Sequence, residues 1–135
     1  MAARLPVALA VLCLGTLGCG RSDDRVAATE VADRFFAAVS ADDGAAACAQ
    51  LSAGTRKQFE RDEQQPCRDA IGGVPIEPGT LEAIEVYSTN AKADLANGDS
   101  AFLSLTETGW RLSAVGCKPA EGPPSDVPMD CEIEA

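Results

Sequence analysis

Residues 81–117, LEAIEVYSTNAKADLANGDSAFLSLTETGWRLSAVGC, decide the fold of this 135-residue chain. Apolar and polar residues alternate within this stretch, most clearly in AKADL at 91–95, and such alternation is typical of a strand with one buried face. The Asn-Gly pair at 97–98 is a strong hairpin signal, and the Thr-Gly pair at 108–109 indicates another turn. The pattern therefore predicts four antiparallel strands, over residues 81–88, 91–95, 100–106 and 110–117.

The N-terminal half of the chain has a helical period instead. Apolar residues recur at spacings of three and four within residues 26–41, so they form one stripe along a helix. Shorter helices are predicted over 45–51 and 53–62, the latter capped by Ser52, with a further turn over 67–71. This order indicates an α+β fold, in which N-terminal helices pack on a curved antiparallel meander sheet of four to five strands. The fifth would be an edge strand at 131–133, and residues 26–135 would form a single domain.

The first residues of the chain indicate export. Residues 1–18 have one charge, Arg4, followed by an apolar run over 6–17. This run fits a signal peptide and is shorter than the roughly 20 apolar residues that a transmembrane helix needs. The sequence LGTLGCG at 14–20 resembles a bacterial lipobox, which implies that Cys19 becomes the lipid-bearing N-terminus. Residues 19–25 would then be a polar tether. The alternative is ordinary cleavage and a secreted chain.

Six cysteines are present, and four of them follow the expected tether: Cys48, Cys67, Cys117 and Cys131. Four cysteines allow three pairings, and disulfides form in the oxidising space outside the cytoplasmic membrane. We favour Cys48–Cys67 and Cys117–Cys131, because each pair closes a short loop within one structural unit. A zinc site made by all four is the rival, but no C-x-x-C spacing supports it.

The charge balance and the absence of histidine exclude several functions. There are 11 basic and 21 acidic residues, a formal charge of −10, which argues against a nucleic-acid partner. Without histidine, the chain cannot build Ser-His-Asp or Cys-His nucleophiles or an imidazole metal site. We predict no cofactor, no metal and no catalytic residue. Asp33 and Asp94 are the only carboxylates weighed as a general base, and their pattern places both outward.

Two charged clusters have ordinary interpretations. The aspartate pairs at 23–24 and 42–43 lack the spacing of a calcium loop, so they are interpreted as part of the tether and a turn. The cluster Arg56, Lys57, Arg61 and Arg68 could meet an acidic partner. It is interpreted as a solvated helix face, since acidic residues interleave with it.

Two parts of the chain carry a resemblance. The segments FFAAV at 35–39, DDGAAAC at 42–48 and GWRLSAVGCKP at 109–119 resemble those of small actinobacterial lipoproteins of uncharacterised function. The helical opening and the GWR strand also resemble the nuclear transport factor 2-like superfamily, which implies a cone-shaped α+β fold. That superfamily includes enzymes, binding proteins and scaffolds, so the fold alone carries no activity. Its cavity lies between the first helix and the sheet, and the candidate lining here is Phe35, Tyr87, Phe102 and Trp110. The alternative is that these aromatic residues simply form the core.

The function expected from these observations is structural. We expect a lipid-anchored, non-enzymatic accessory or assembly protein at the outer face of the cytoplasmic membrane. Its partners would be the membrane, through the lipid, and an envelope protein. The alternative is a module that binds a small ligand in the helix–sheet cavity, and a lyase or isomerase is less favoured.

Overall fold

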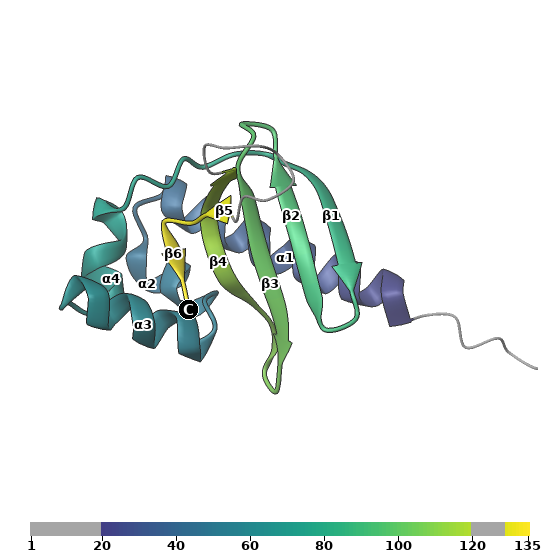
Figure 1. Cartoon of the computed structure of the whole chain (residues 1–135), viewed down its shortest axis with the longest axis horizontal. Coiled ribbons are helices and arrows are strands. Elements are labelled where there is room, and N and C mark those ends of the chain that lie inside the picture. The colour runs from purple at the N-terminus through teal and green to yellow at the C-terminus, as the bar shows by residue number, and fades with distance from the viewer. Residues whose placement is uncertain (1–19, 120–128) are drawn as a thin grey trace, which may run out of the picture.

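The computed structural model describes residues 20–119 and 129–135, which form helices followed by an antiparallel sheet (Figure 1). The α+β class predicted from the sequence is confirmed. The expected signal peptide, residues 1–18, and Cys19 lie outside the described residues. The helices are α1 (Gly20–Ser40), α2 (Gly44–Ala49), α3 (Ala53–Glu63), α4 (Cys67–Ala70) and the 3₁₀ turn η1 (Ile71–Gly73). The strands are β1 (Leu81–Tyr87), β2 (Asn90–Leu95), β3 (Ser100–Thr106), β4 (Gly109–Pro119), β5 (Met129–Asp130) and β6 (Ile133–Glu134).

The sheet is a meander whose first four strands follow chain order. Strand order is β1-β2-β3-β4-β5, with β6 also paired to β4, and each pairing is antiparallel. Gly98 and Gly109 have φ angles of 90° and 102°, a region that a residue without Cβ enters at little cost. These glycines lie in the two turns that the sequence signals predicted.

The C-terminal edge strand is split in two, so the sheet has six strands where four to five were expected. Between β5 and β6, the Glu132 N–H donates to Val115 O at 3.1 Å. Gly116, opposite this break, has φ 65°, and a Cβ there would lie 2.8 Å from Glu132 Cγ. Glycine at position 116 therefore allows Glu132 to approach β4 closely between the two short strands.

The first helix begins earlier than its apolar period indicates. Residues 20–25, expected to belong to a polar tether, are helical, and α1 runs from Gly20 to Ser40. The negative charge of Asp23 in the first turn stabilises the helix, because it lies at the positive end of the helix dipole. The Trp110 Nε1–H also donates to Asp24 Oδ1 at 3.1 Å, across 86 residues of sequence. This tertiary contact, which periodicity cannot show, holds the start of α1 against the domain.

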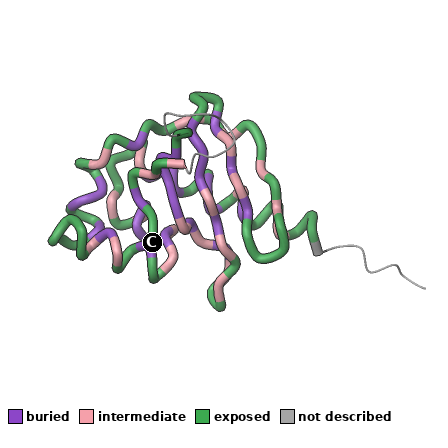
Figure 2. Tube along the Cα trace, viewed as in Figure 1, coloured by how far each residue is buried: buried purple, intermediate pink, exposed green. Residues whose placement is uncertain are grey.

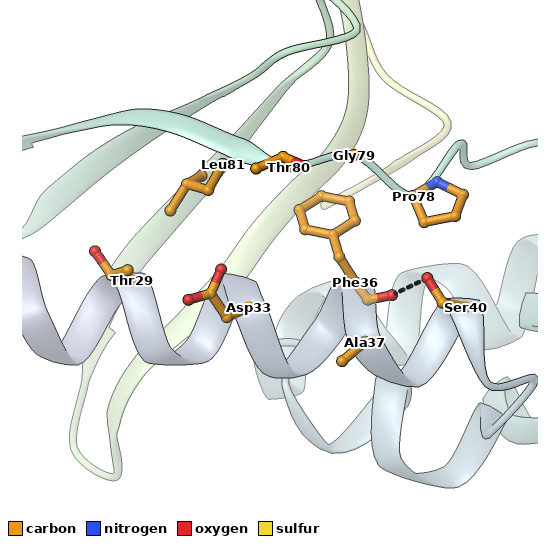
Figure 3. A pocket seen from close by; sticks show the side chains of 9 residues that line it. All are labelled: Thr29, Asp33, Phe36, Ala37, Ser40, Pro78, Gly79, Thr80 and Leu81. Atoms are coloured by element: carbon orange, nitrogen blue, oxygen red, sulfur yellow. Dashed lines mark hydrogen bonds between the residues drawn. The ribbon is translucent and has the colours of Figure 1, made fainter.

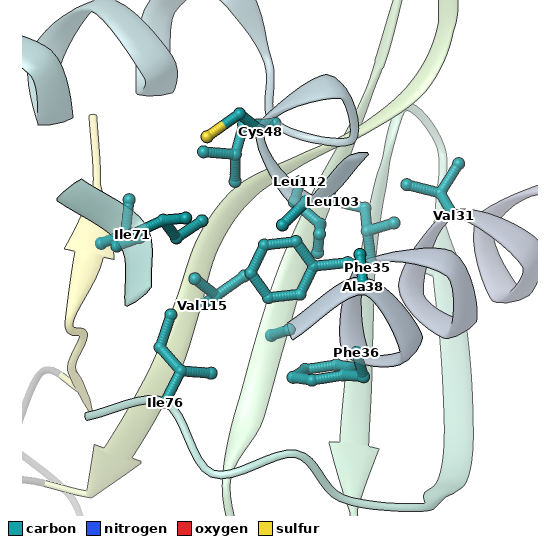
Figure 4. Packing of buried hydrophobic residues seen from close by; sticks show 14 of the residues in the cluster. Val31, Phe35, Phe36, Ala38, Cys48, Ile71, Ile76, Leu103, Leu112 and Val115 are labelled. Atoms are coloured by element: carbon teal, nitrogen blue, oxygen red, sulfur yellow. The ribbon is translucent and has the colours of Figure 1, made fainter. Parts of the chain in front are cut away.

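The hydrophobic core lies between α1 and one face of the sheet (Figure 4). Phe35 is fully buried at its centre, with Leu103, Leu112 and Val115 from the sheet around it. Buried and exposed residues alternate along the strands (Figure 2), and no described helix covers the opposite face of the sheet in Figure 1. Small side chains are frequent on both sides of the interface, and those 0–2% exposed are Ala28, Ala32, Ala91, Ala93 and Ala101.

The three shorter helices are fixed to the β4 side of the sheet. Ser52 caps α3, as predicted, by accepting a hydrogen bond from the Thr55 N–H at 3.1 Å. Thr55 is fully buried, and its hydroxyl donates to Ser113 O at 3.0 Å. The Ser52 N–H donates to Leu112 O at 2.8 Å, so the start of α3 is tied to β4 by both backbone and side chain.

Both predicted disulfides are confirmed. Cys48–Cys67 joins α2 to α4, and Cys117–Cys131 joins β4 to the C-terminal segment. Each therefore lies within one half of the domain, the first among the helices and the second at the sheet edge. The pairings indicate an oxidising, extracytoplasmic environment.

Candidate functional site

A cleft lies between α1 and the segment that leads into β1 (Figure 3). Its volume is about 610 Å³, and we call it the α1 cleft. The lining residues are Thr29, Asp33, Phe36, Ala37 and Ser40 from α1, with Pro78, Gly79, Thr80 and Leu81 opposite. Residues at these helix positions lie on one face because they are three or four apart.

The α1 cleft combines an apolar floor with one charge. Phe36 is 6% exposed and its ring points toward Gly79, whereas Asp33 is exposed and points toward Leu81. The Ser40 hydroxyl is already engaged, since it donates to Phe36 O at 2.9 Å. The lining offers one carboxylate and several hydroxyls, so the cleft has the chemistry to bind a small cation with an apolar part. It brings no second titratable group to Asp33 for proton transfer.

The four aromatic residues proposed to line a cavity do not come together. Phe35 and Trp110 are buried, at 0% and 3% exposure, whereas Tyr87 is 59% exposed at the end of β1. Phe102 is half-buried and lies across from Lys92 on the uncovered face of the sheet. The interior between α1 and the sheet is instead filled by the core (Figure 4).

The two carboxylates weighed as a general base occupy different surfaces. Asp33 lies in the α1 cleft, whereas Asp94 lies on the uncovered face of the sheet. The Lys92 ammonium, 2.9 Å from Asp94 Oδ1, and then the Ser100 hydroxyl, at 2.7 Å, lower the pKa of the Asp94 carboxyl below 3.8. A general base at neutral pH needs a raised pKa, so this environment favours a permanent ion pair.

The basic cluster on the helices is solvated, as its sequence pattern suggested. Arg61 donates to the neighbouring Gln58 side chain, and the Arg68 side chain is 71% exposed, with Nε 3.7 Å from Asp69 Oδ1. Arg56 also borders a second cleft of about 540 Å³, between the start of α3 and the β3–β4 turn, which Arg111 lines from the other side. The Arg111 guanidinium is partly engaged there, since it donates to Trp110 O at 2.7 Å.

The aspartate pairs have structural roles. Asp43 caps α2, because its Oδ1 accepts a hydrogen bond from the Ala46 N–H at 3.0 Å, and Asp42 occupies the turn with φ 54°. In residues 20–119 and 129–135, no group of three acidic or cysteine side chains is arranged to hold a metal ion. None of the helices in these ranges is both long and apolar enough to cross a bilayer.

The comparisons with known proteins add no relative. No family model, curated protein or solved structure matches this chain.

Sequence reasoning missed both the α1 cleft and the partner of Trp110. Residues 78–80 were predicted as part of a loop and Leu81 as the start of a strand, and no local pattern shows that this segment runs along α1. Asp24 belonged to an apparent tether, so nothing linked it to an indole 86 residues away. The only usable signal was that a buried tryptophan needs a partner for its N–H.

Proposed function

We propose that this chain is a lipid-anchored accessory protein of a bacterial cell envelope, held at the outer face of the cytoplasmic membrane through Cys19. The observation that carries the proposal is the division of the cysteines. Cys48, Cys67, Cys117 and Cys131 form two disulfides, as expected of an exported domain. Cys19 stands apart from these pairs in a lipobox-like sequence, and the resemblance to small actinobacterial lipoproteins points the same way.

The geometry of the domain supports a binding or assembly role over catalysis. The space between α1 and the sheet is filled by side chains, and the two carboxylates considered for proton transfer lie on different surfaces. Two or more acyl chains would supply firm anchoring, which one chain gives only marginally. An accessory subunit should then be recovered with an integral membrane protein after mild crosslinking of intact envelopes. Recovery of the protein alone would contradict that role.

Intact-mass analysis of the protein from its native membrane tests the anchor. We expect a chain that begins at Cys19 and carries diacylglycerol, and a mass increase of two hydrogens per disulfide after reduction. Cys19→Ala should abolish the lipid mass, whereas the matched variant Cys13→Ala should keep it. A chain with an unmodified N-terminus after cleavage would refute the anchor and leave the secreted alternative.

The α1 cleft favours one alternative, a module that binds a small ligand. Asp33 is the charged group of its lining, so a small organic cation with an apolar part is the chemistry that fits. Titration of a panel of such cations should shift the backbone resonances of residues 29–40 and 78–81. Asp33→Asn should remove the response, whereas Glu30→Gln, which alters a carboxylate paired with Arg34 outside the cleft, should keep it. No shift with any cation would refute this alternative.

A further inference from the structure

Three large apolar side chains are exposed in the described part of the chain: Val26 and Tyr87 at 59%, and Leu105 at 42%. Single apolar residues on a surface are ordinary, but a group of them at one place indicates an interaction site. Tyr87 and Leu105 lie at the same end of the sheet, although the strand register turns their side chains to opposite faces. The Leu105 N–H donates to Thr89 O at 2.8 Å, and Thr89 lies in the β1–β2 turn two residues after Tyr87.

The third exposed side chain belongs to the same end of the domain. Leu105 pairs with Trp110 across the β3–β4 hairpin, and the Trp110 indole holds Asp24, two residues before Val26. Figure 1 shows the N-terminal end of α1 beside the β1–β2 turn. This region of the domain consists of the start of α1 with Val26, the β1–β2 turn with neighbouring Tyr87 and the β3–β4 turn with neighbouring Leu105. We call it the N-terminal end.

The expected lipid would attach directly at the N-terminal end. Cys19 is bonded to Gly20, the first residue of α1, and neighbouring Cα atoms are about 3.8 Å apart. The helix is fixed to the domain, because Ala28 and Phe35 are fully buried and Asp24 is bound by Trp110. The segment that could have been a flexible tether is part of a rigid helix, so an acyl group on Cys19 would place the domain itself at the bilayer surface.

We propose that the N-terminal end is the membrane-facing surface of the domain, and that Val26, Tyr87 and Leu105 enter the interfacial layer of the bilayer. The inference rests on the proposed function, since the acyl chains on Cys19 bring this end to the lipid. Tyrosine suits this position because its ring is apolar and its hydroxyl reaches water. The Tyr87 hydroxyl donates to the exposed Glu85 side chain, so its polar group has a partner.

Charge and the other surfaces of the domain are consistent with this seating. Arg21 and Arg25 balance Asp23 and Asp24 in the first turns of α1, so neither strong attraction to nor repulsion from anionic headgroups is expected there. The uncovered face of the sheet carries the Lys92–Asp94 ion pair, and α3 is dominated by charged residues. The bound state should therefore not weaken as salt is added, in contrast to a polybasic membrane anchor, because this end has no excess of basic residues.

Fluorescence quenching by brominated lipid tests the seating. The chain has one tryptophan, so Trp110→Phe removes the native emitter and introduced tryptophans can be read singly. Lipidated Tyr87→Trp and Leu105→Trp variants are placed in vesicles of phosphatidylcholine and phosphatidylglycerol, with or without dibrominated phosphatidylcholine. We expect emission to fall about twofold or more, because interfacial apolar groups lie among the upper acyl carbons. The control Gln65→Trp, an exposed site between α3 and α4, should be unaffected.

Two further measurements keep the test decisive. A flexible Gly-Ser segment inserted between Cys19 and Gly20 should leave acylation intact and reduce the quenching at position 87. In the wild-type chain, amide exchange at residues 87–90 and 105–108 should slow on vesicles when Cys19 is acylated, while residues 64–66 are unchanged. This second readout does not depend on the Trp110→Phe background.

The outcomes separate the two proposals. Acylation at Cys19 with quenching at positions 87 and 105 but not at 65 supports both. Acylation with equal quenching at all three positions, or no slowing of exchange at the N-terminal end, overturns the seating and leaves the anchor standing. An unmodified Cys19 in the intact mass overturns the anchor and the seating with it.

Discussion

Loss of both disulfides should remove most of the stability of this domain. In the chain-entropy treatment, a cross-link stabilises by restricting the unfolded chain, and its contribution grows with the logarithm of the loop length. The Cys48–Cys67 loop has a sequence separation of 19, which corresponds to about 3.2 kcal/mol at 25 °C. The Cys117–Cys131 separation of 14 corresponds to about 3.0 kcal/mol. Their combined contribution, about 6 kcal/mol, is comparable to the whole unfolding free energy of a small domain, about 5–15 kcal/mol.

The two disulfides also differ in how much hydrophobic packing their cysteines contribute. Cys48 and Cys67 are 6% and 2% exposed among the helices, so replacing both by alanine also removes core contacts. Cys117 is 0% exposed but lies outside the main hydrophobic cluster, and Cys131 is half-buried at the sheet edge, so less core packing is lost there. We expect Cys48→Ala/Cys67→Ala to be more destabilising than Cys117→Ala/Cys131→Ala, although the entropic contributions are nearly equal.

The assay is urea unfolding followed by circular dichroism, in a secreted Cys19→Ser background without an unpaired N-terminal thiol. Each double variant should lose at least about 3 kcal/mol with an unchanged or larger m-value, because the unfolded chain becomes less compact. The fully reduced protein should be largely unfolded at room temperature. A loss below about 1 kcal/mol in either variant, or a reduced protein as stable as the oxidised one, would refute the reasoning.

Three other perturbations test separate contacts. Trp110→Phe and Asp24→Ala should each cost about 1–2 kcal/mol, and a double-mutant cycle in urea should give a coupling energy of about 1 kcal/mol; additive effects would show that the indole does not hold α1. Gly44→Ala should cost about 2 kcal/mol or more by thermal unfolding, because its Cβ would lie 2.2 Å from Arg68 O in the backbone of α4, whereas Gly72→Ala, with open space around it, should be tolerated. The lowered pKa of Asp94 gives stability that is present above the unfolded-state value of 3.8 and lost as pH falls through the lower folded-state value. Asp94→Asn should cost under about 1 kcal/mol at pH 7 and flatten the stability profile below pH 4, and an unchanged profile would contradict the ion pair.

Local patterns were sufficient to predict the fold because sequence neighbours are also neighbours in space. The strand predicted over 100–106 matches β3 residue for residue, and the turns at Gly98 and Gly109 join consecutive strands. The disulfide pairs were predictable for the same reason, since each closes a loop within one half of the chain. An antiparallel meander has few long-range choices, so periodicity and turn residues specify most of it.

Features that depend on distant contacts were not predictable. The polar residues at 20–25 have no apolar stripe, and their helical state is supported by Trp110 from the other end of the chain. The α1 cleft similarly depends on the return of residues 78–81 along α1, for which a Pro- and Gly-containing loop gives no local signal. The aromatic residues failed as a guide because alternation along a strand assigns a face but does not show which face is covered: Phe102 lies on the uncovered one.

The way α1 crosses the sheet has a mechanical consequence. A pull on the N-terminus would load α1 along its own axis, and its contacts with the sheet would resist by sliding rather than by opening one at a time. The alanines of that interface offer little resistance to sliding, because methyl groups interlock only slightly. Resistance would come from the fully buried Phe35 side chain and from the Trp110–Asp24 hydrogen bond near the N-terminus of α1, where the force is applied. A force applied at Gly20 would thus reach the β3–β4 hairpin first, through Trp110, and the centre of the sheet afterwards, through Phe35.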